Sequence, residues 1–187
     1  MDILTSPLPS EVKCGSKFYK INTDFKVWIE IENTFWDDKM SQNEKIAKVL
    51  FLAYKTLPPT IEDALYALMS FYLMGNDKSE NKKGLKTLKR LYSFKEDAPY
   101  IYSAFLKEYS IDLTKTDLHW WQFISLFKSL GDENKICRII RWRAMDIENI
   151  KNKEEKKFAR KMKHLYRLEC EKNNTEKDMI CALESLF

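Results

Sequence analysis

Apolar residues recur every three or four positions along most of the chain, which is the spacing of helices that bury one face. Capping boxes at 41–44 and 93–96, a proline pair at 58–59 and glycines at 75 and 131 divide this pattern into segments. Helices are predicted to begin near residues 25, 41, 60, 93, 116, 132, 152 and 175, and Asp132 and Asn152 are expected to cap the helices that follow them. The sequence therefore predicts a mainly α fold, a helical bundle of roughly seven helices.

The first 22 residues follow a different pattern. Val12 and Cys14 alternate with polar residues, Gly15-Ser16 supplies a tight turn, and Phe18 and Ile21 follow it. This predicts a small N-terminal β-hairpin over 1–22. Residues 76–84 are polar and aperiodic, which predicts a mobile loop, and 169–187 are predicted to form a C-terminal helix. Because the sequence holds no internal repeat and no second set of complete apolar faces, residues 1–187 are predicted to form a single helical domain.

Composition narrows the class of protein without giving a function. The 187 residues are 44% hydrophobic and 32% charged, which is typical of a soluble globular protein. Four glycines are too few for a turn-rich β fold or a glycine-rich phosphate-binding loop. The net charge of +4 and the pI of about 8.7 do not require a nucleic-acid partner, because acidic residues are interleaved with the basic ones.

The cysteines give no sign of a metal site. Cys14, Cys137, Cys170 and Cys181 are far apart, whereas zinc ligands usually come in closely spaced pairs. The N-terminus lacks the basic and apolar regions of a secretory signal, and the longest apolar stretch, 64–74, is too short to span a bilayer. We therefore expect a reduced cytoplasmic protein with no metal, no cofactor and no contact with a membrane.

Common catalytic motifs are missing from the sequence. It contains no H-E-x-x-H, G-x-S-x-G, G-x-x-x-x-G-K-[ST] or G-x-G-x-x-G motif. Neighbouring carboxylates such as Asp37 and Asp38 do not face each other on a helix, so they are expected to be solvated surface residues. The sequence therefore predicts a protein that is not an enzyme.

The most conspicuous local cluster is His119-Trp120-Trp121. Adjacent tryptophans on a helix point about 100° apart, so one of them is expected in the core and the other at a boundary or an interface. His119 could serve as a general base, a pH switch or a hydrogen-bonded packing residue. The packing role is favoured, because no serine or cysteine motif accompanies this histidine.

A second cluster is basic. Arg138, Arg141 and Arg143 surround Trp142, and a run of basic residues extends over 151–167. Such a helix could lie along phosphate groups while Trp142 stacks on a base. The alternative, which we favour, is that one of the arginines pairs with an acid such as Asp146 and that the lysines form a solvated helix face.

Seven short motifs occur in a fixed order from about residue 8 to 168. They are Leu8-Pro9-x-Glu11, Tyr19-x-Ile21-Asn22-Thr23-Asp24-Phe25, Pro58-Pro59, Tyr92-Ser93-Phe94-x-x-Asp97-Ala98-x-x-Ile101-Tyr102-x-Ala104-Phe105, Ile111-Asp112-Leu113, Leu118-His119-Trp120-Trp121-x-Phe123 and Arg143-x-Met145-Asp146. Their order resembles the bacteriophage family named for gene product fifteen of Gram-positive siphophages and prophages.

The resemblance implies a largely helical tail assembly chaperone, which self-associates and coats the tape-measure protein in the host cytoplasm but is absent from the mature virion. A further partner that the resemblance allows is a shorter chaperone encoded upstream of this protein. The residues expected at the protein-binding surface are Trp120 or Trp121, Trp142, Arg141 and Arg143. The rival function is a nucleic-acid-binding or head-completion phage protein that uses the basic region 138–167.

Overall fold

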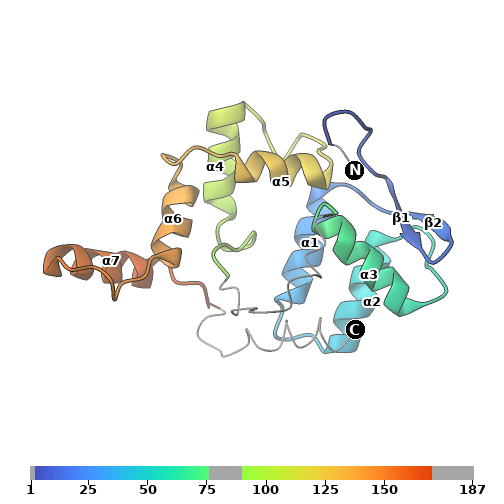
Figure 1. The fold of residues 1–187 in the computed structure, drawn as a ribbon, viewed down its shortest axis with the longest axis horizontal. Helices are drawn as coiled ribbons and strands as arrows, with labels where there is room; N and C mark the ends of the chain where they lie inside the picture. The colour runs from blue at the N-terminus through green and yellow to red at the C-terminus, as the bar shows by residue number, and fades with distance from the viewer. Residues whose placement is uncertain (1–2, 76–89, 170–187) are drawn as a thin grey trace. The chain divides into compact units, whose positions relative to one another are not determined.

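The computed structural model describes residues 3–75 and 90–169 (Figure 1). Within these residues it contains seven helices and one two-stranded antiparallel sheet, so the predicted mainly α fold with an N-terminal hairpin is confirmed. The described residues fall into two compact units. Unit 1 comprises 3–75 and 117–125, and unit 2 comprises 90–116 and 126–169. That the chain acts as a single domain stays a prediction.

The hairpin of unit 1 consists of β1 (Glu11–Cys14) and β2 (Lys17–Lys20). Cys14 pairs with Lys17 across the two-residue turn, and Gly15 adopts a positive φ of 60°, which a glycine adopts without steric cost. Val12 and Cys14 are buried, as the alternation predicts. The backbone of Ile21 pairs with that of Tyr54, so the strand region continues onto the segment that follows the second helix.

Three helices follow the hairpin in unit 1: α1 (Phe25–Phe35), α2 (Gln42–Ala53) and α3 (Ile61–Tyr72). The capping box predicted at 41–44 is present, with Ser41 bonded to the Glu44 backbone and Glu44 bonded to the Ser41 backbone. Helix α2 ends before the proline pair, as expected. Figure 1 shows the hairpin beside α2 and α3, and β1 packs against α3.

Helix α5 (Trp120–Lys128) supplies its first residues to the core of unit 1. The segment before it is fixed by backbone pairing, since Phe25 N–H donates to Leu118 O at 3.0 Å and Trp120 N–H donates to Thr23 O at 2.7 Å. The aromatic rings of α1, α3 and α5 and of the residue before α5 therefore meet in one cluster. Its members are Phe25, Trp28, Phe71, Tyr72, His119, Trp120, Trp121 and Phe123.

Unit 2 contains α4 (Ala98–Tyr109), α6 (Lys135–Ala144) and α7 (Lys153–Leu165). Helix α6 packs against both α4 and α7. Glu108 on α4 accepts hydrogen bonds from the backbone of Gly131 and the side chain of Asn134, which caps α6, so the end of α4 is tied to the start of α6. Asn152 caps α7 through bonds to two backbone N–H groups, as predicted.

Three predicted helix starts are wrong. Helix α4 begins at Ala98, because Asp97 rather than Glu96 bonds the Ser93 backbone and residues 93–97 form a turn instead of a helix. Helix α5 begins at Trp120, because residues 117–119 are held extended by the backbone pairing described above. Helix α6 has Asn134 rather than Asp132 at its N-cap position, and Asp132 forms an ion pair with Arg141.

The predicted mobile loop at 76–84 lies outside the described residues, and so does the C-terminal helix predicted over 169–187, apart from its first residue. Over the part of the chain that is described, no helix is both long enough and apolar enough to cross a bilayer.

Candidate protein-interaction surface

The two adjacent tryptophans are both buried, so the expectation that one of them points outward is wrong. Trp121 donates its indole N–H to the Phe71 carbonyl at 2.8 Å, and Trp120 stacks against Trp28 and Tyr72. Both rings are buried because the cluster surrounds the start of α5 from two sides. Their contacts within unit 1 are those of core residues, and a role in partner binding stays an untested prediction.

His119 is a hydrogen-bonded packing residue, the role that the sequence favours. Its Nε2 lies 3.0 Å from the Pro9 carbonyl oxygen, and its Nδ1 accepts a hydrogen bond from the Trp121 backbone N–H at 3.1 Å. Since Nδ1 is an acceptor, the proton of the neutral ring is on Nε2, which donates to Pro9. The ring thus fastens the N-terminal segment to the start of α5. Burial lowers the pKa of His119, and the bond to Pro9 opposes that shift in part.

Acidification from pH 7.5 to 5.5 is expected to lower the melting temperature through His119. The unfolded ring takes up a proton near pH 6.5, while the folded ring has a lowered pKa, so the unfolded state binds more protons and stability falls as the pH drops. Differential scanning fluorimetry of His119→Gln should show a shallower pH slope than wild type. His164→Gln, which alters an exposed histidine, is the matched control and should retain the full slope.

Arg143 is buried in unit 2 in an ion pair with Asp97. The two side chains are 4% and 2% exposed, and the guanidinium binds both carboxylate oxygens, at 2.6 and 2.9 Å. Two further N–H groups of Arg143 donate to the carbonyls of Leu91 at 3.0 Å and Tyr166 at 2.6 Å. Arg143 therefore holds together three segments of unit 2: α6, residues 91–97 and Tyr166. The prediction that Arg143 lies at the surface is wrong, because its side chain is buried.

Arg141, two residues earlier on α6, does reach the surface. It pairs with Asp132 at 2.8 Å, and the two side chains are 54% and 86% exposed. The prediction that an arginine of this cluster pairs with an acid is thus confirmed, but the acids are Asp97 and Asp132 rather than Asp146. Asp146 instead caps the turn that follows, through bonds to Glu148 N–H and to the Asn149 amide.

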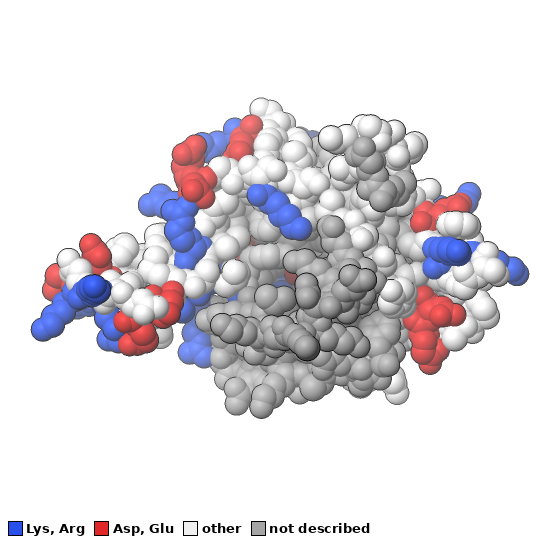
Figure 2. All heavy atoms as spheres, in the orientation of Figure 1, with Lys and Arg blue, Asp and Glu red and all other residues white. Residues whose placement is uncertain are grey.

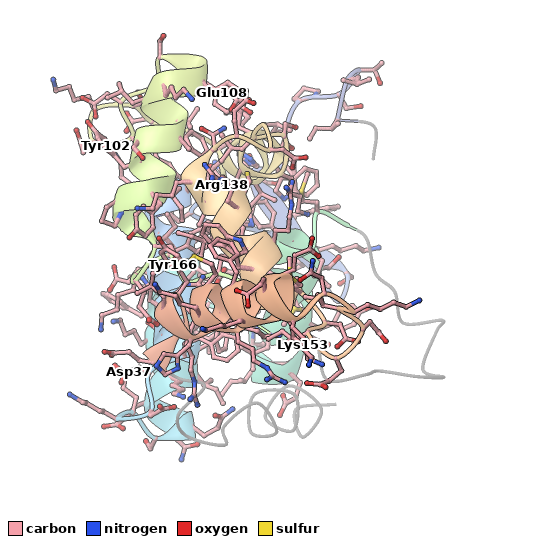
Figure 3. All side chains as sticks on the ribbon, turned by 90° about the vertical axis from the view of Figure 1, so that its left-hand side faces the viewer. Asp37, Tyr102, Glu108, Arg138, Lys153 and Tyr166 are labelled. Atoms are coloured by element: carbon pink, nitrogen blue, oxygen red, sulfur yellow. The ribbon has the colours of Figure 1, made fainter. Side chains whose placement is uncertain are left out.

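Trp142 on α6 lies half-buried in a group of rings that come from different parts of unit 2. Its indole stacks on Tyr166 at 5.2 Å with an interplanar angle of 17°, and the Arg138 guanidinium lies 5.8 Å from the indole centre. The Lys135 ammonium lies 4.6 Å from the ring centre of Tyr100, which contacts Tyr166 edge-on. In Figure 3, Arg138 on α6 lies above Tyr166, which follows α7. Tryptophan, tyrosine and arginine side chains are enriched at protein interfaces.

Helix α7 presents a row of apolar side chains that unit 2 leaves open. Phe158 is 56% exposed and Leu165 is 62% exposed, Met162 lies between them, and the residue of α7 that is buried is Ala159. The spacing i, i+4, i+7 puts the three side chains on one face, and Tyr166 continues the row four residues after Met162. We call Trp142, Tyr166, Met162, Phe158 and Leu165 the α6–α7 surface.

The sequence pattern shows this row as a helix face but not that it stays uncovered. A period of 3.6 reports which side chains share a face and says nothing about what packs on them. One signal was available: the other side chains of α7 include six basic and two acidic residues, which leaves a narrow apolar row in a helix that is otherwise polar. Figure 2 shows basic and acidic side chains side by side over α7.

Among the described residues, no three His, Cys, Asp or Glu side chains come together in a way that could hold a metal ion. The described cysteines, Cys14 and Cys137, are both reduced. Burial raises the pKa of the Cys137 thiol, and nearby acids add to the shift, so this thiol is less nucleophilic than a free cysteine at neutral pH. The α6–α7 surface itself offers aromatic, aliphatic and basic side chains, which can contact a binding partner.

Comparison with known proteins finds a match to a protein family. The family model described as "Bacteriophage Gp15 protein" matches residues 4–168, which include both clusters and all of α7. No curated protein and no solved structure matches the chain.

Proposed function

The chain belongs to the bacteriophage Gp15 protein family, and from this premise we propose that it is a tail assembly chaperone, which binds the tape-measure protein and keeps it soluble while the tail tube assembles. In this proposal it acts in the cytoplasm of the host cell, self-associates, works with a shorter upstream chaperone if one is made, and is absent from the mature virion. Its role is to bind, and it catalyses no reaction.

The observation that carries this proposal is the uncovered α6–α7 surface. Exposed apolar side chains at i, i+4 and i+7 match the heptad-like faces of a long helical client, and helix-on-helix packing is a common mode of peptide recognition. The apolar row is short and its side chains are already partly buried, so each copy of the protein contributes only a modest binding free energy to the client. Many modest contacts allow a coat that is displaced when the tail tube closes around its client.

A nucleic-acid-binding or head-completion role is the second candidate, and the Trp142 stack with its two cations is the observation that favours it. The charges around it weigh against this role, because several basic side chains are already engaged by acids. Arg141 pairs with Asp132, and Lys156 and Arg160 both pair with Glu148. A nucleic-acid complex should weaken steeply between 50 and 200 mM salt, whereas the proposed chaperone should retain no DNA in this range.

Replacing Phe158 and Leu165 by serine is expected to abolish client solubilisation. Each side chain contributes about 1.5 kcal/mol when a partner covers it, so losing both weakens binding roughly a hundredfold. The client is the product of the very long helical reading frame expected immediately downstream. The measurement is the soluble fraction of that protein after co-expression with wild type or with Phe158→Ser/Leu165→Ser.

The matched control is Phe51→Ser. Phe51 is also an exposed phenylalanine, 82% accessible, but it lies on α2 of unit 1, away from the α6–α7 surface in sequence and in fold unit. Circular dichroism should show that all variants keep their helices. If the double variant keeps the client as soluble as wild type does, or if Phe51→Ser loses it equally, the α6–α7 surface is not the client site.

A further inference from the structure

Two exposed lysines border the apolar row of α7 along one side. Lys161 follows Phe158 by three residues and precedes Leu165 by four, so it lies beside both, and Lys157 lies one turn before it. Neither lysine pairs with a carboxylate of residues 3–75 or 90–169. Other lysines of α7 are engaged, since Lys156 pairs with Glu148 and Lys163 donates to the Met145 carbonyl.

The opposite border of the α6–α7 surface is also basic. Arg138 and Lys135 lie over the rings of the Trp142 stack and leave their charges at its edge. The acids of α7, Glu154 and Glu155, lie in its first turn, where Asn152 caps their backbone N–H groups and their negative charges interact favourably with the positive end of the helix dipole. The apolar row is therefore flanked by positive charge on both sides beyond the first turn.

We propose that the α6–α7 surface binds an amphipathic helix whose apolar face is flanked by carboxylates. This inference rests on the proposed function and names the chemical class of the client segment. Apolar side chains of the client cover Phe158, Met162 and Leu165, and its Asp or Glu side chains meet Lys157 and Lys161. Charge complementarity of this kind selects among helices that share the same apolar face.

A second copy of this chain fits the same surface less well. In an antiparallel pairing of two α7 helices centred on the apolar row, Lys161 of each copy faces Lys161 of the other, and like charges at that position repel. Nucleic acid also fits less well, because Phe158 and Leu165 would have to be covered by phosphate or ribose. An acidic amphipathic helix satisfies the apolar row and the lysines together.

The test uses two synthetic helical peptides with the same apolar face, one flanked by Glu and the other by Lys. Fluorescence anisotropy of the labelled peptides is measured against the full-length protein. The Glu peptide is expected to bind about tenfold more tightly, since each of two exposed ion pairs contributes up to about 0.7 kcal/mol. The preference should shrink in 0.5 M NaCl, because salt screens exposed pairs.

The charge reversal Lys157→Glu/Lys161→Glu should invert the preference, so that the Lys peptide binds more tightly. Lys13→Glu/Lys55→Glu is the matched control: it makes the same change in net charge at exposed positions of unit 1 and should leave the preference for the Glu peptide intact. Equal binding of both peptides by wild type overturns the proposal. The proposal is also overturned if neither peptide binds and light scattering shows a wild-type dimer that Phe158→Ser/Leu165→Ser dissociates, because a second copy then occupies the surface.

This experiment and the co-expression experiment fail independently. If the Glu peptide binds selectively but the tape-measure protein is insoluble with wild type, the surface recognises acidic helices and the chaperone function is wrong. If the tape-measure protein is held by the surface but the peptides bind equally, the chaperone function stands and the acidic client class is wrong.

Discussion

Replacing Asp97 by alanine is expected to lower the free energy of unfolding by about 3–5 kcal/mol, because the Arg143 guanidinium is left buried without its counter-charge. The carboxylate also accepts the Ser93 backbone N–H at 2.9 Å, so the substitution leaves a second buried donor unpaired. Urea denaturation followed by circular dichroism at 222 nm measures the loss. Thermal scans should place the variant well below wild type.

Arg141→Met is the control, since it removes a neighbouring ion pair that is largely exposed and is expected to cost less than about 1 kcal/mol. A second variant, Asp97→Asn/Arg143→Met, removes both buried charges together and should recover part of the loss. Recovery is incomplete because the Leu91 and Tyr166 carbonyls lose their donor. Equal costs for Asp97→Ala and Arg141→Met would show that the buried pair does not hold unit 2 together.

Replacing Trp120 by alanine is expected to cost about 3–5 kcal/mol, the range for removing a large ring from a packed core. The ring is buried and lies within 6.0 Å, centre to centre, of Trp28, Tyr72 and Phe123, so its removal leaves a cavity that three other rings line. The loss is measured by urea denaturation, and tryptophan fluorescence during the same titration reports the packing of the remaining indoles.

Trp142→Ala separates packing from binding. Because the Trp142 ring is half-buried and stacks mainly on Tyr166, the variant should lose less stability than Trp120→Ala and yet bind the acidic peptide more weakly. If Trp120→Ala were as stable as wild type and lost client binding, the sequence-based assignment of this residue to an interface would be right and the packing account wrong.

Local signals in the sequence predict much of the fold. The turn at Gly15-Ser16, the capping box at Ser41 and the cap at Asn152 are each specified by residues within a few positions of one another, and all three occur as predicted. Hydrophobic spacing also identifies the seven helices among the described residues. Interactions within one turn survive folding because the rest of the chain does not compete for them.

Predicted helix starts fail where a distant residue competes for the same group. The Ser93 N–H bonds Asp97, whose carboxylate is in turn held by Arg143, 46 residues further on. Residues 117–119 are drawn into backbone pairing with the segment that precedes α1. Neither event has a signature within the local window that a capping motif uses, so tertiary contacts override the local preference.

The sequence predicts only part of the candidate site, because contacts with distant segments also decide which of its residues are exposed. Trp142 and Arg141 lie at the surface as a mixed aromatic and basic cluster suggests, whereas Trp120, Trp121 and Arg143 are buried by partners from other segments. A tryptophan or an arginine suits both an interface and a core, and residue type alone does not decide between them. The apolar row on α7 needs knowledge of what packs against the helix, which periodicity does not supply.

The contrast between Arg141 and Arg143 also gives unit 2 an internal reporter. A guanidinium-specific reagent such as phenylglyoxal should label Arg141 in the native protein and spare Arg143, although the two lie two residues apart on one helix. The fraction of Arg143 that carries the adduct is measured over time by peptide mapping. Because Arg143 is labelled only when it is exposed, this fraction reports how often α6 separates from the 91–97 segment. The rate of labelling at Arg143 would therefore measure the opening of unit 2 without a denaturant.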